Sequence, residues 1–292
     1  MLRAVAAVAC VCLLSAAATP PAFKFMSLAY NPSGVATTAQ RQKGFSETTL
    51  RTDLQHLVPY TRGIRTYSTE FGLVRIPPIA RELGLKVSLG LWLGKDRDKN
   101  DAEIARGIHV VLGNTDVIDR VYVGNEAIVR GELTAEEVIP YIGRMKDALA
   151  GRKIPVGTAE PWHVWLKNPA LGAASNFIGA HIYAYHDGPP VAEAVAYLDR
   201  RVQELQAAFP AKPIVIAETG WPWAGRVNQA AQPSAAAQAE YLRDFLRRAA
   251  QAHYIYTVVE AYDQPWKAPE EQGALWGLLA DDGKPKFPFQ VP

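Results

Sequence analysis

Short apolar and β-branched runs recur along this chain roughly every thirty to forty residues, and segments with helical patterning separate them, a spacing typical of consecutive βα units. Eight such runs occur, at residues 25–31, 63–69, 86–94, 120–126, 154–161, 177–186, 213–221 and 256–266. Several are almost entirely apolar, as expected of strands buried on both faces. No Gly-x-Gly-x-x-Gly follows the first run, which disfavours a dinucleotide-binding sheet. The pattern therefore predicts an α/β fold, a closed (β/α)8 TIM barrel.

Capping signals predict where the intervening helices begin. The expected N-termini are Ser46, Asn100 with Glu103, Thr134 in a capping box whose helix closes at Gly151, and Ser234, whose helix ends near Ala252. Pro77 and Pro78 predict a further helix start, because the missing N–H groups of proline cost little in a first turn.

The length of 292 residues fits one barrel domain, and no linker or internal boundary interrupts residues 23–292. Hydrophobic residues make up 49% of the chain and charged residues 21%, which is ordinary globular composition. The 31 basic and 29 acidic residues are interspersed without basic runs, so nucleic acid is not an expected partner. We expect a monomer.

The N-terminal residues 1–18 have the order of a secretory signal peptide. Arg3 precedes an apolar run at residues 4–14, and small residues follow up to Ala18, after which we predict cleavage. The run is too short to span a membrane. These features predict a secreted or periplasmic protein, and since Cys10 and Cys12 both lie in this segment, the mature chain would have no cysteine.

Two carboxylates directly follow apolar strands. Glu126 ends the fourth run and Glu218 lies near the end of the seventh, where the catalytic groups of a TIM barrel are found. Burying a carboxylate is costly, so each either forms structural hydrogen bonds or takes part in chemistry. Two carboxyls facing each other across the barrel mouth suit the pair that cleaves a glycosidic bond.

The residues of these motifs resemble those of glycoside hydrolase family 17, the β-1,3-glucanase family, and the short loops resemble its compact bacterial type. The resemblance lies in Val-Gly-Asn-Glu ending at Glu126, Glu-Thr-Gly-Trp-Pro beginning at Glu218, Arg65-Thr66-Tyr67, and the segment from Tyr262 to Lys267. It implies a retaining mechanism in which Glu126 is the acid/base and Glu218 the nucleophile. Retention requires carboxyl groups about 5 to 5.5 Å apart.

The resemblance also implies roles for neighbouring residues. Asn125 is expected to bind the sugar hydroxyl next to the reacting carbon, unless it only makes a strand-end turn bond. Tyr183 is expected beside the nucleophile, or else is packed in a barrel layer. Glu260 and Lys267 resemble a charged cluster near the nucleophile, although a salt bridge at the rim explains them equally well.

The sixth run departs from plant members of the family. Those read Asn-x-Tyr-Pro-Tyr where this chain has His181, Tyr183 and Tyr185 at alternate positions. His181 is therefore an uncertain site residue, and we expect both tyrosines on its strand face. His186 falls on the opposite face of such a strand, so the histidines do not suggest a metal site, and we expect no metal or cofactor.

Aromatic residues gather at the predicted strand ends, where flat apolar faces can stack on sugar rings. The candidates are Tyr30, Tyr67, Trp92, Trp162, Trp221 and Trp266. Any one of them could instead close the barrel as core.

Three functional hypotheses remain open. The first is an enzyme acting on β-1,3-glucan, which hydrolyses it or transfers the cleaved segment to another glucan, and the compact form favours transfer by analogy. The second is a non-catalytic β-glucan-binding barrel, although both Glu126 and Glu218 are present. The third is a barrel enzyme of different chemistry, for which the chain lacks an evident phosphate loop or metal-ligand cluster.

Overall fold

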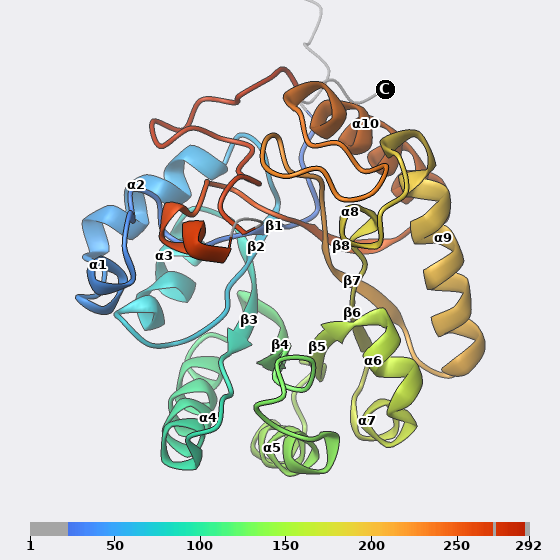
Figure 1. Ribbon diagram of the computed structural model, residues 1–292. Helices are drawn as coiled ribbons and strands as arrows, with labels where there is room; N and C mark the ends of the chain where they lie inside the picture. The colour runs from blue at the N-terminus through green and yellow to red at the C-terminus, as the bar shows by residue number, and fades with distance from the viewer. Residues whose placement is uncertain (1–22, 271–272, 290–292) are drawn as a thin grey trace, which may run out of the picture.

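The computed structural model describes residues 23–270 and 273–289, and it confirms the predicted TIM barrel (Figure 1). Eight parallel strands form a closed barrel in sequence order, and the first strand pairs with the last through Leu28 and Val258. The strands are β1 (Leu28–Ala29), β2 (Gly63–Arg65), β3 (Lys86–Leu91), β4 (Ile118–Asn125), β5 (Val156–Pro161), β6 (Ile178–His181), β7 (Ile214–Thr219) and β8 (Ile255–Val258).

Every strand overlaps a predicted run, but most are shorter than the run. The apolar character of the run continues past the last ladder bond, and the chain there turns into loops or helices that cover the barrel mouth. After β6, for example, the backbone enters α8 (Ala184–Asp187) instead of remaining extended to residue 186.

Helices surround the barrel (Figure 1). They are α1 (Thr38–Gln42), α2 (Glu47–Leu57), α3 (Ile76–Glu82), α4 (Arg97–Leu112), α5 (Ala135–Ala148), α6 (Trp162–Lys167), α7 (Pro169–Ala174), α8, α9 (Val191–Ala208) and α10 (Ala235–Ala252), with 3-10 turns η1 (Leu73–Arg75) and η2 (Pro265–Glu270).

Most predicted helix starts are confirmed. Ser46 caps α2, Ser234 caps α10, and the side chains of Thr134 and Glu137 form a reciprocal capping box at the start of α5. The paired prolines lie in the first turn of α3. Local sequence signals were sufficient here because each cap is completed within one turn of the chain.

The predicted start at Asn100 is wrong, because Asp96 caps α4 instead. The side chain of Asn100 bonds both backbone polar groups of Gly94, with Nδ2 donating at 2.7 Å and Oδ1 accepting at 2.8 Å. Glu103 accepts the N–H of Thr69 at 2.7 Å. Both side chains are buried and anchor loops at the barrel mouth.

Buried charge gathers at the carboxyl ends of the strands. Four charged side chains at or near the ends of apolar strands are at most 9% exposed, namely those of Arg65, Glu160, Glu218 and Glu260. Charged groups buried in this way are ordinarily paired or functional. This end of the barrel is therefore the candidate location of the functional site.

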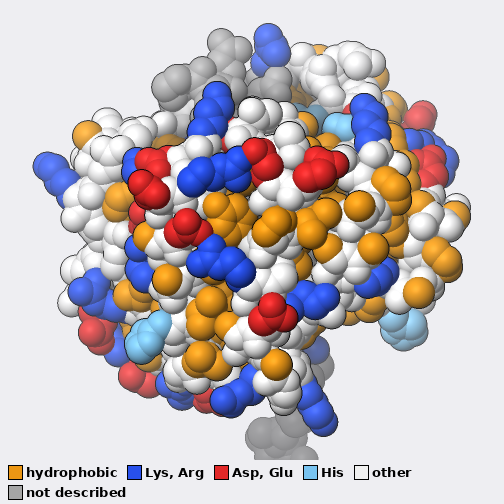
Figure 2. Space-filling view, turned by 90° about the horizontal axis from the view of Figure 1, so that it is seen from below, with side chains coloured by type: hydrophobic (Ala, Val, Ile, Leu, Met, Phe, Trp, Pro, Cys, Tyr) orange, Lys and Arg blue, Asp and Glu red, His pale blue; other side chains and the backbone are white. Residues whose placement is uncertain are grey.

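The outer surface carries mixed charge. On the face shown in Figure 2, acidic and basic side chains are intermingled with apolar ones and do not gather by sign. Among the described residues, no helix has the length and apolar character needed to cross a membrane. The predicted signal peptide, residues 1–18, lies outside the described part of the chain.

Candidate active site

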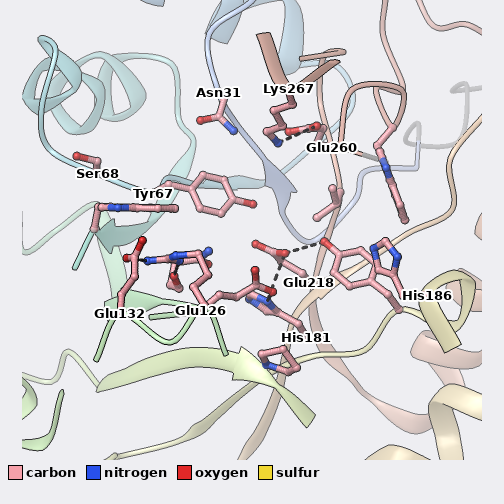
Figure 3. A pocket seen from close by; sticks show the side chains of 18 of the residues that line it. Asn31, Tyr67, Ser68, Glu126, Glu132, His181, His186, Glu218, Glu260 and Lys267 are labelled. Atoms are coloured by element: carbon pink, nitrogen blue, oxygen red, sulfur yellow. Dashed lines mark hydrogen bonds and ion pairs between the residues drawn. The ribbon is translucent and has the colours of Figure 1, made fainter. Parts of the chain in front are cut away.

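A cavity of about 800 Å³ opens at the carboxyl ends of the strands and lies within the usual size range of ligand pockets (Figure 3). Asn31, Glu260 and Lys267 lie on one side of it, Glu126 and His181 on the other, and Glu218 between them.

Glu126 and Glu218 reach the cavity from different kinds of backbone. Glu218 is part of β7, and its side chain is 9% exposed. Glu126 follows the last residue of β4 in a left-handed conformation, with φ of 55°, and its side chain is 32% exposed. The N–H of Glu126 donates to the carbonyl of Ala159 on β5 at 2.8 Å. One carboxyl is thus enclosed by the barrel, and the other faces the open cavity.

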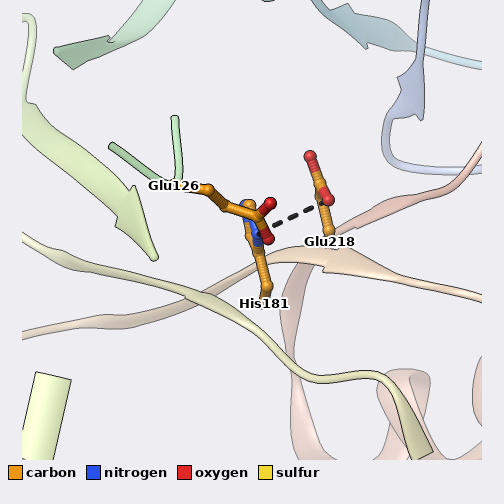
Figure 4. A group of neighbouring side chains, drawn as sticks. All are labelled: Glu126, His181 and Glu218. Carbon is orange, nitrogen blue, oxygen red and sulfur yellow. Dashed lines mark hydrogen bonds and ion pairs between the residues drawn. The ribbon is translucent and has the colours of Figure 1, made fainter. Parts of the chain in front are cut away.

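The two carboxyls lie close together, with His181 beside them (Figure 4). One ligand atom from each of Glu126, His181 and Glu218 lies within 4.8 Å of the other two. His181 Nδ1 is 2.7 Å from Glu126 Oε1, with which it shares a hydrogen bond, and 3.5 Å from Glu218 Oε2. The imidazole, which is 2% exposed, therefore touches both carboxyls.

The surroundings of Glu218 stabilise its ionised form. Burial alone would raise its pKa, but His181, Arg65 and hydrogen bonds from Tyr183 and Tyr67 lower the pKa to about 2. The Tyr183 hydroxyl donates to Glu218 Oε2 at 2.6 Å, and Arg65 Nη1 donates to Oε1. Glu218 is therefore a carboxylate at any ordinary pH.

Arg65 connects the two strand-end motifs. It is fully buried, and its Nη2 donates to Asn125 Oδ1 at 2.7 Å while Nη1 also donates to the carbonyl of Ala217 at 3.0 Å. Burial alone would lower its pKa, but Glu218 raises it above the ordinary value, so the guanidinium stays charged. Arg65 was not among the predicted site residues, although an arginine in an otherwise apolar strand was a usable signal.

Glu260 and Lys267 form the predicted charged pair on the wall of the cavity. Lys267 Nζ lies 3.5 Å from Glu260 Oε1. Burial, together with the negative charge of Glu218, raises the pKa of Glu260 to about 7 against the opposing charge of Lys267. The pair is thus close to the nucleophile candidate and not on the outer rim.

Most of the predicted sugar-binding aromatics line the cavity. Tyr67, Trp92, Trp162, Tyr183 and Trp266 are all part of its wall, together with Asn125 and His181. The Trp92 side chain is 41% exposed, and the Arg130 guanidinium lies 4.2 Å from its ring centre. A ring held on one side by a guanidinium can offer its other side to a ligand.

Three predicted binding residues do not reach the cavity. The Tyr30 hydroxyl donates to Asp53 Oδ2 of α2 at 3.0 Å. Tyr185 lies on α8, and its hydroxyl donates to the carbonyl of Arg226. Trp221 is fully buried between the rings of Tyr185 and Tyr241. These side chains are core, and the prediction that they bind substrate is corrected.

The cavity also contains residues that the sequence did not single out. Trp276 packs against Tyr183 and His186 at centroid distances of 5.2 and 5.5 Å. Arg41 lies 5.0 Å from the centre of the Trp266 ring. Arg41 lies on the short helix α1, which the sequence did not predict, and Trp276 lies outside the strands and helices, so only the folded chain brings them to the site. Other such lining residues are Asn31, Ser68, Arg130, Glu132 and His163.

Glu126, His181 and Glu218 also form a donor set of the kind that holds a metal ion. An ion among them would lie next to the guanidinium of Arg65, which already neutralises Glu218. The expectation that the chain uses no metal stays a prediction.

Comparisons with known proteins identify the family of this chain. A model of the BtgE/BtgC glycoside hydrolase domain matches residues 27–277. A glucan 1,3-β-glucosidase of Arthroderma benhamiae is 27% identical over 260 residues, covering 80% of this chain and 82% of the relative. The probable β-glucosidase btgE of Neosartorya fischeri is 28% identical over 223 residues, which cover 74% of this chain but only 40% of that protein.

Solved structures share the fold. The family 17 β-1,3-glucanosyltransferase of Rhizomucor miehei has a TM-score of 0.81 at 24% identity, with 91% of this chain and 98% of that chain covered. An active-site mutant of that enzyme in complex with laminaritriose has a TM-score of 0.79 at the same identity and coverage. The predicted resemblance to glycoside hydrolase family 17 is thereby confirmed. The chain belongs to the BtgE/BtgC glycoside hydrolase domain family.

Proposed function

We propose that this protein is a retaining β-glycosidase acting on β-1,3-glucan through a covalent glycosyl-enzyme. The observation that carries the proposal is the pair Glu126 and Glu218, whose carboxyl oxygens approach within 4.8 Å in two different environments. That approach suits direct attack by one carboxylate better than the wider separation, about 6.5 to 9.5 Å between carboxyl groups, that leaves room for the water of an inverting enzyme.

In the first step, a Glu218 oxygen attacks the anomeric carbon while the bond to the leaving sugar oxygen breaks. Glu126 gives its proton to that oxygen, so the leaving group departs as an alcohol. Arg65, Tyr67 and Tyr183 keep the nucleophile ionised and fix its orientation before substrate binds. The partly exposed position of Glu126 lets it reach a leaving group in the cavity.

In the second step, Glu126 acts as a base. It removes a proton from water or from a sugar hydroxyl, whose oxygen attacks the anomeric carbon and releases Glu218. Water gives hydrolysis and a sugar hydroxyl gives transfer, so one site supports both outcomes. Asn125 accepts from Arg65 through Oδ1, which leaves its amide N–H groups for the hydroxyl beside the reacting carbon.

β-1,3-Glucan is the substrate class that the site supports best. Trp92, Trp162 and Trp266 supply flat faces around the cavity, and Asn31, Glu260 and Lys267 supply polar groups for hydroxyls. The relative from Arthroderma benhamiae is named for activity on 1,3-β-glucan, and the Rhizomucor miehei enzyme is named as a β-1,3-glucanosyltransferase.

Residues 23–292 form the catalytic unit in this proposal, acting as a monomer, and residues 1–18 direct export to the periplasm or the medium. Expression with residues 1–18 present should give a product that begins at residue 19 outside the cytoplasm. Intact-mass measurement of the exported and retained fractions checks this, and an unprocessed product in both fractions would contradict it.

The test of the reaction is product analysis on a β-1,3-gluco-oligosaccharide labelled at the reducing end, at low and high concentration. Shorter fragments indicate hydrolysis, products longer than the substrate indicate transfer, and NMR identifies the new linkage. Glu126→Gln and Glu218→Gln should each abolish turnover, whereas Glu193→Gln, an exposed carboxyl on α9, should not. Binding without turnover by the wild type would favour a glucan-binding barrel.

Azide separates the two roles. With an aryl β-glycoside, Glu218→Ala should give the α-glycosyl azide, because azide takes the place of the missing nucleophile. Glu126→Ala should give the β-glycosyl azide, because azide attacks the glycosyl-enzyme from the opposite face. If Glu218→Ala instead gave the β-glycosyl azide and Glu126→Ala the α-glycosyl azide, Glu126 would be the nucleophile and Glu218 the acid/base.

A further inference from the structure

Another buried carboxyl, that of Glu160, lies against the segment that carries Glu126. Glu160 is the penultimate residue of β5, and its exposed fraction is 0%. It does not line the cavity, so it cannot touch a sugar there. The two-step reaction proposed above gives it no role.

Glu160 binds the backbone of the segment that carries Glu126. Its Oε1 accepts the N–H of Ile128 at 2.8 Å, and its Oε2 accepts the N–H of Val129 at 3.2 Å. The carbonyl of the preceding residue, Ala159, accepts the N–H of Glu126. Three N–H groups within four residues of the segment are thus held by two adjacent residues of β5.

The segment depends on such contacts because no regular element fixes it. Residues 126–133 belong to neither a helix nor a strand, and Glu126 has the positive φ that L-residues rarely adopt. Local propensity therefore does not favour the observed conformation. Arg130 holds the far end of the segment, where Nη2 donates to the carbonyl of Leu93 at 2.9 Å.

A purely stabilising role explains Glu160 poorly. Burial raises its pKa to about 7, even though the N–H groups of Ile128 and Val129 and the nearby His181 act to lower it. The folded state therefore disfavours the ionised carboxyl near neutral pH, relative to the unfolded chain. What the side chain provides is a fixed place for two N–H groups next to Glu126.

We propose that Glu160 is a positioning residue that holds the segment 126–129 so that the Glu126 carboxyl meets the leaving-group oxygen. The proposal rests on the proposed function, in which Glu126 is the acid/base. General acid catalysis requires the carboxyl within hydrogen-bond reach of the oxygen it protonates, and small displacements lower the rate strongly.

The test is Glu160→Gln with two substrates of different leaving-group ability. Glutamine keeps the shape and one acceptor oxygen, but its NH2 group then faces the N–H of Val129. With a β-1,3-gluco-oligosaccharide, whose sugar leaving group needs a proton, kcat should fall about 10- to 100-fold while KM changes less than about twofold. With 2,4-dinitrophenyl β-laminaribioside, whose leaving group departs unprotonated, the burst rate of dinitrophenol release should change less than about threefold.

Asp53→Asn is the matched control. Asp53 is also a buried carboxyl, and its Oδ2 accepts the N–H of Ser33 at 2.8 Å, away from the cavity. Asp53→Asn should lower the melting temperature without changing the ratio between the rate of oligosaccharide cleavage and the rate of the dinitrophenol burst. If Glu160→Gln does not fold, Glu160→Asp carries the same test, because it withdraws the carboxyl by one methylene and keeps its charge.

Glu126→Gln distinguishes the possible failures. If this variant loses oligosaccharide cleavage but keeps the dinitrophenol burst, the acid/base role stands. Equal loss of both rates in the Glu160 variants, or no loss in either, would then overturn the positioning role alone. If wild type itself turns over neither substrate, the proposed function fails first.

Discussion

Removing the Tyr183 hydroxyl should shift the acidic limb of the pH profile. The hydroxyl donates to Glu218 Oε2 at 2.6 Å, and burial together with Glu218 raises the pKa of Tyr183 well above its ordinary value, so it remains a donor. A hydrogen bond to a charged group contributes about 1.5 to 3 kcal/mol, and one pKa unit corresponds to about 1.4 kcal/mol. Tyr183→Phe should therefore raise the pKa of Glu218 by about 1 to 2 units.

The sign of the effect follows from the role of Glu218. The nucleophile must be ionised, so kcat/KM falls as pH drops through its pKa, which is about 2 in the wild type. In Tyr183→Phe, kcat/KM should reach half of its plateau value at about pH 3 to 4, where the wild type keeps about 90% or more of its plateau value. At pH 7 both forms are ionised, and protonation of Glu218 should not lower the rate of either.

The assay is kcat/KM on a labelled β-1,3-gluco-oligosaccharide between pH 2.5 and 7, with circular dichroism at each pH to show that the protein is folded. Tyr254→Phe is the control, because Tyr254 donates to Asp199 at 2.8 Å far from the cavity. Identical acidic limbs in the wild type and Tyr183→Phe would refute the argument that this hydroxyl stabilises the Glu218 anion.

Three further predictions concern binding and stability. Trp92→Ala should raise KM for a long gluco-oligosaccharide about tenfold with little change in kcat, and steady-state kinetics would contradict stacking on this exposed ring if KM were unchanged. The raised pKa of Glu260 makes the folded state lose stability as pH rises from about 4.5 to 7, so Glu260→Gln should gain stability relative to the wild type across that window. Urea denaturation at pH 4.5 and 8 measures the free energy of unfolding of both proteins. A difference between them that is the same at both pH values would argue against the raised pKa. Thr134→Ala should lower the free energy of unfolding by about 1 kcal/mol by removing the α5 cap, and should leave kcat unaltered in the same assays.

The barrel could be predicted from the sequence because its signals are local and repeated. Each βα unit carries its own apolar run, and several units carry their own helix cap, so an error in one unit does not spread to the next. The start of α4 shows the limit of such signals. Asp96 and Asn100 both suit a cap, and only the folded loop shows that Asn100 instead bonds the backbone of Gly94.

The side chains of the site were harder to predict because strand periodicity ends where the site begins. Tyr183 and Tyr185 share a face only if the chain remains extended, but α8 starts between them and turns Tyr185 into the core. Arg65 was missed for a different reason. Its partner Glu218 lies 153 residues away, and an isolated charge in an apolar run does not identify its partner.

Different contacts hold Glu126 and Glu218 in place. Substitutions near one carboxyl should therefore change a different kinetic property from substitutions near the other. Glu218 lies on a barrel strand beside His181, a buried guanidinium and two hydroxyls, so changes at Arg65 or Tyr183 should act on its ionisation and appear in the acidic limb. Glu126 follows the end of β4 on an irregular segment that β5 holds through Ala159 and Glu160. Changes there should leave the acidic limb in place and appear in the dependence on the leaving group. A variant of Glu160 that moved the acidic limb, or a variant of Tyr183 that changed the leaving-group dependence, would show that the two carboxyls are controlled as one unit.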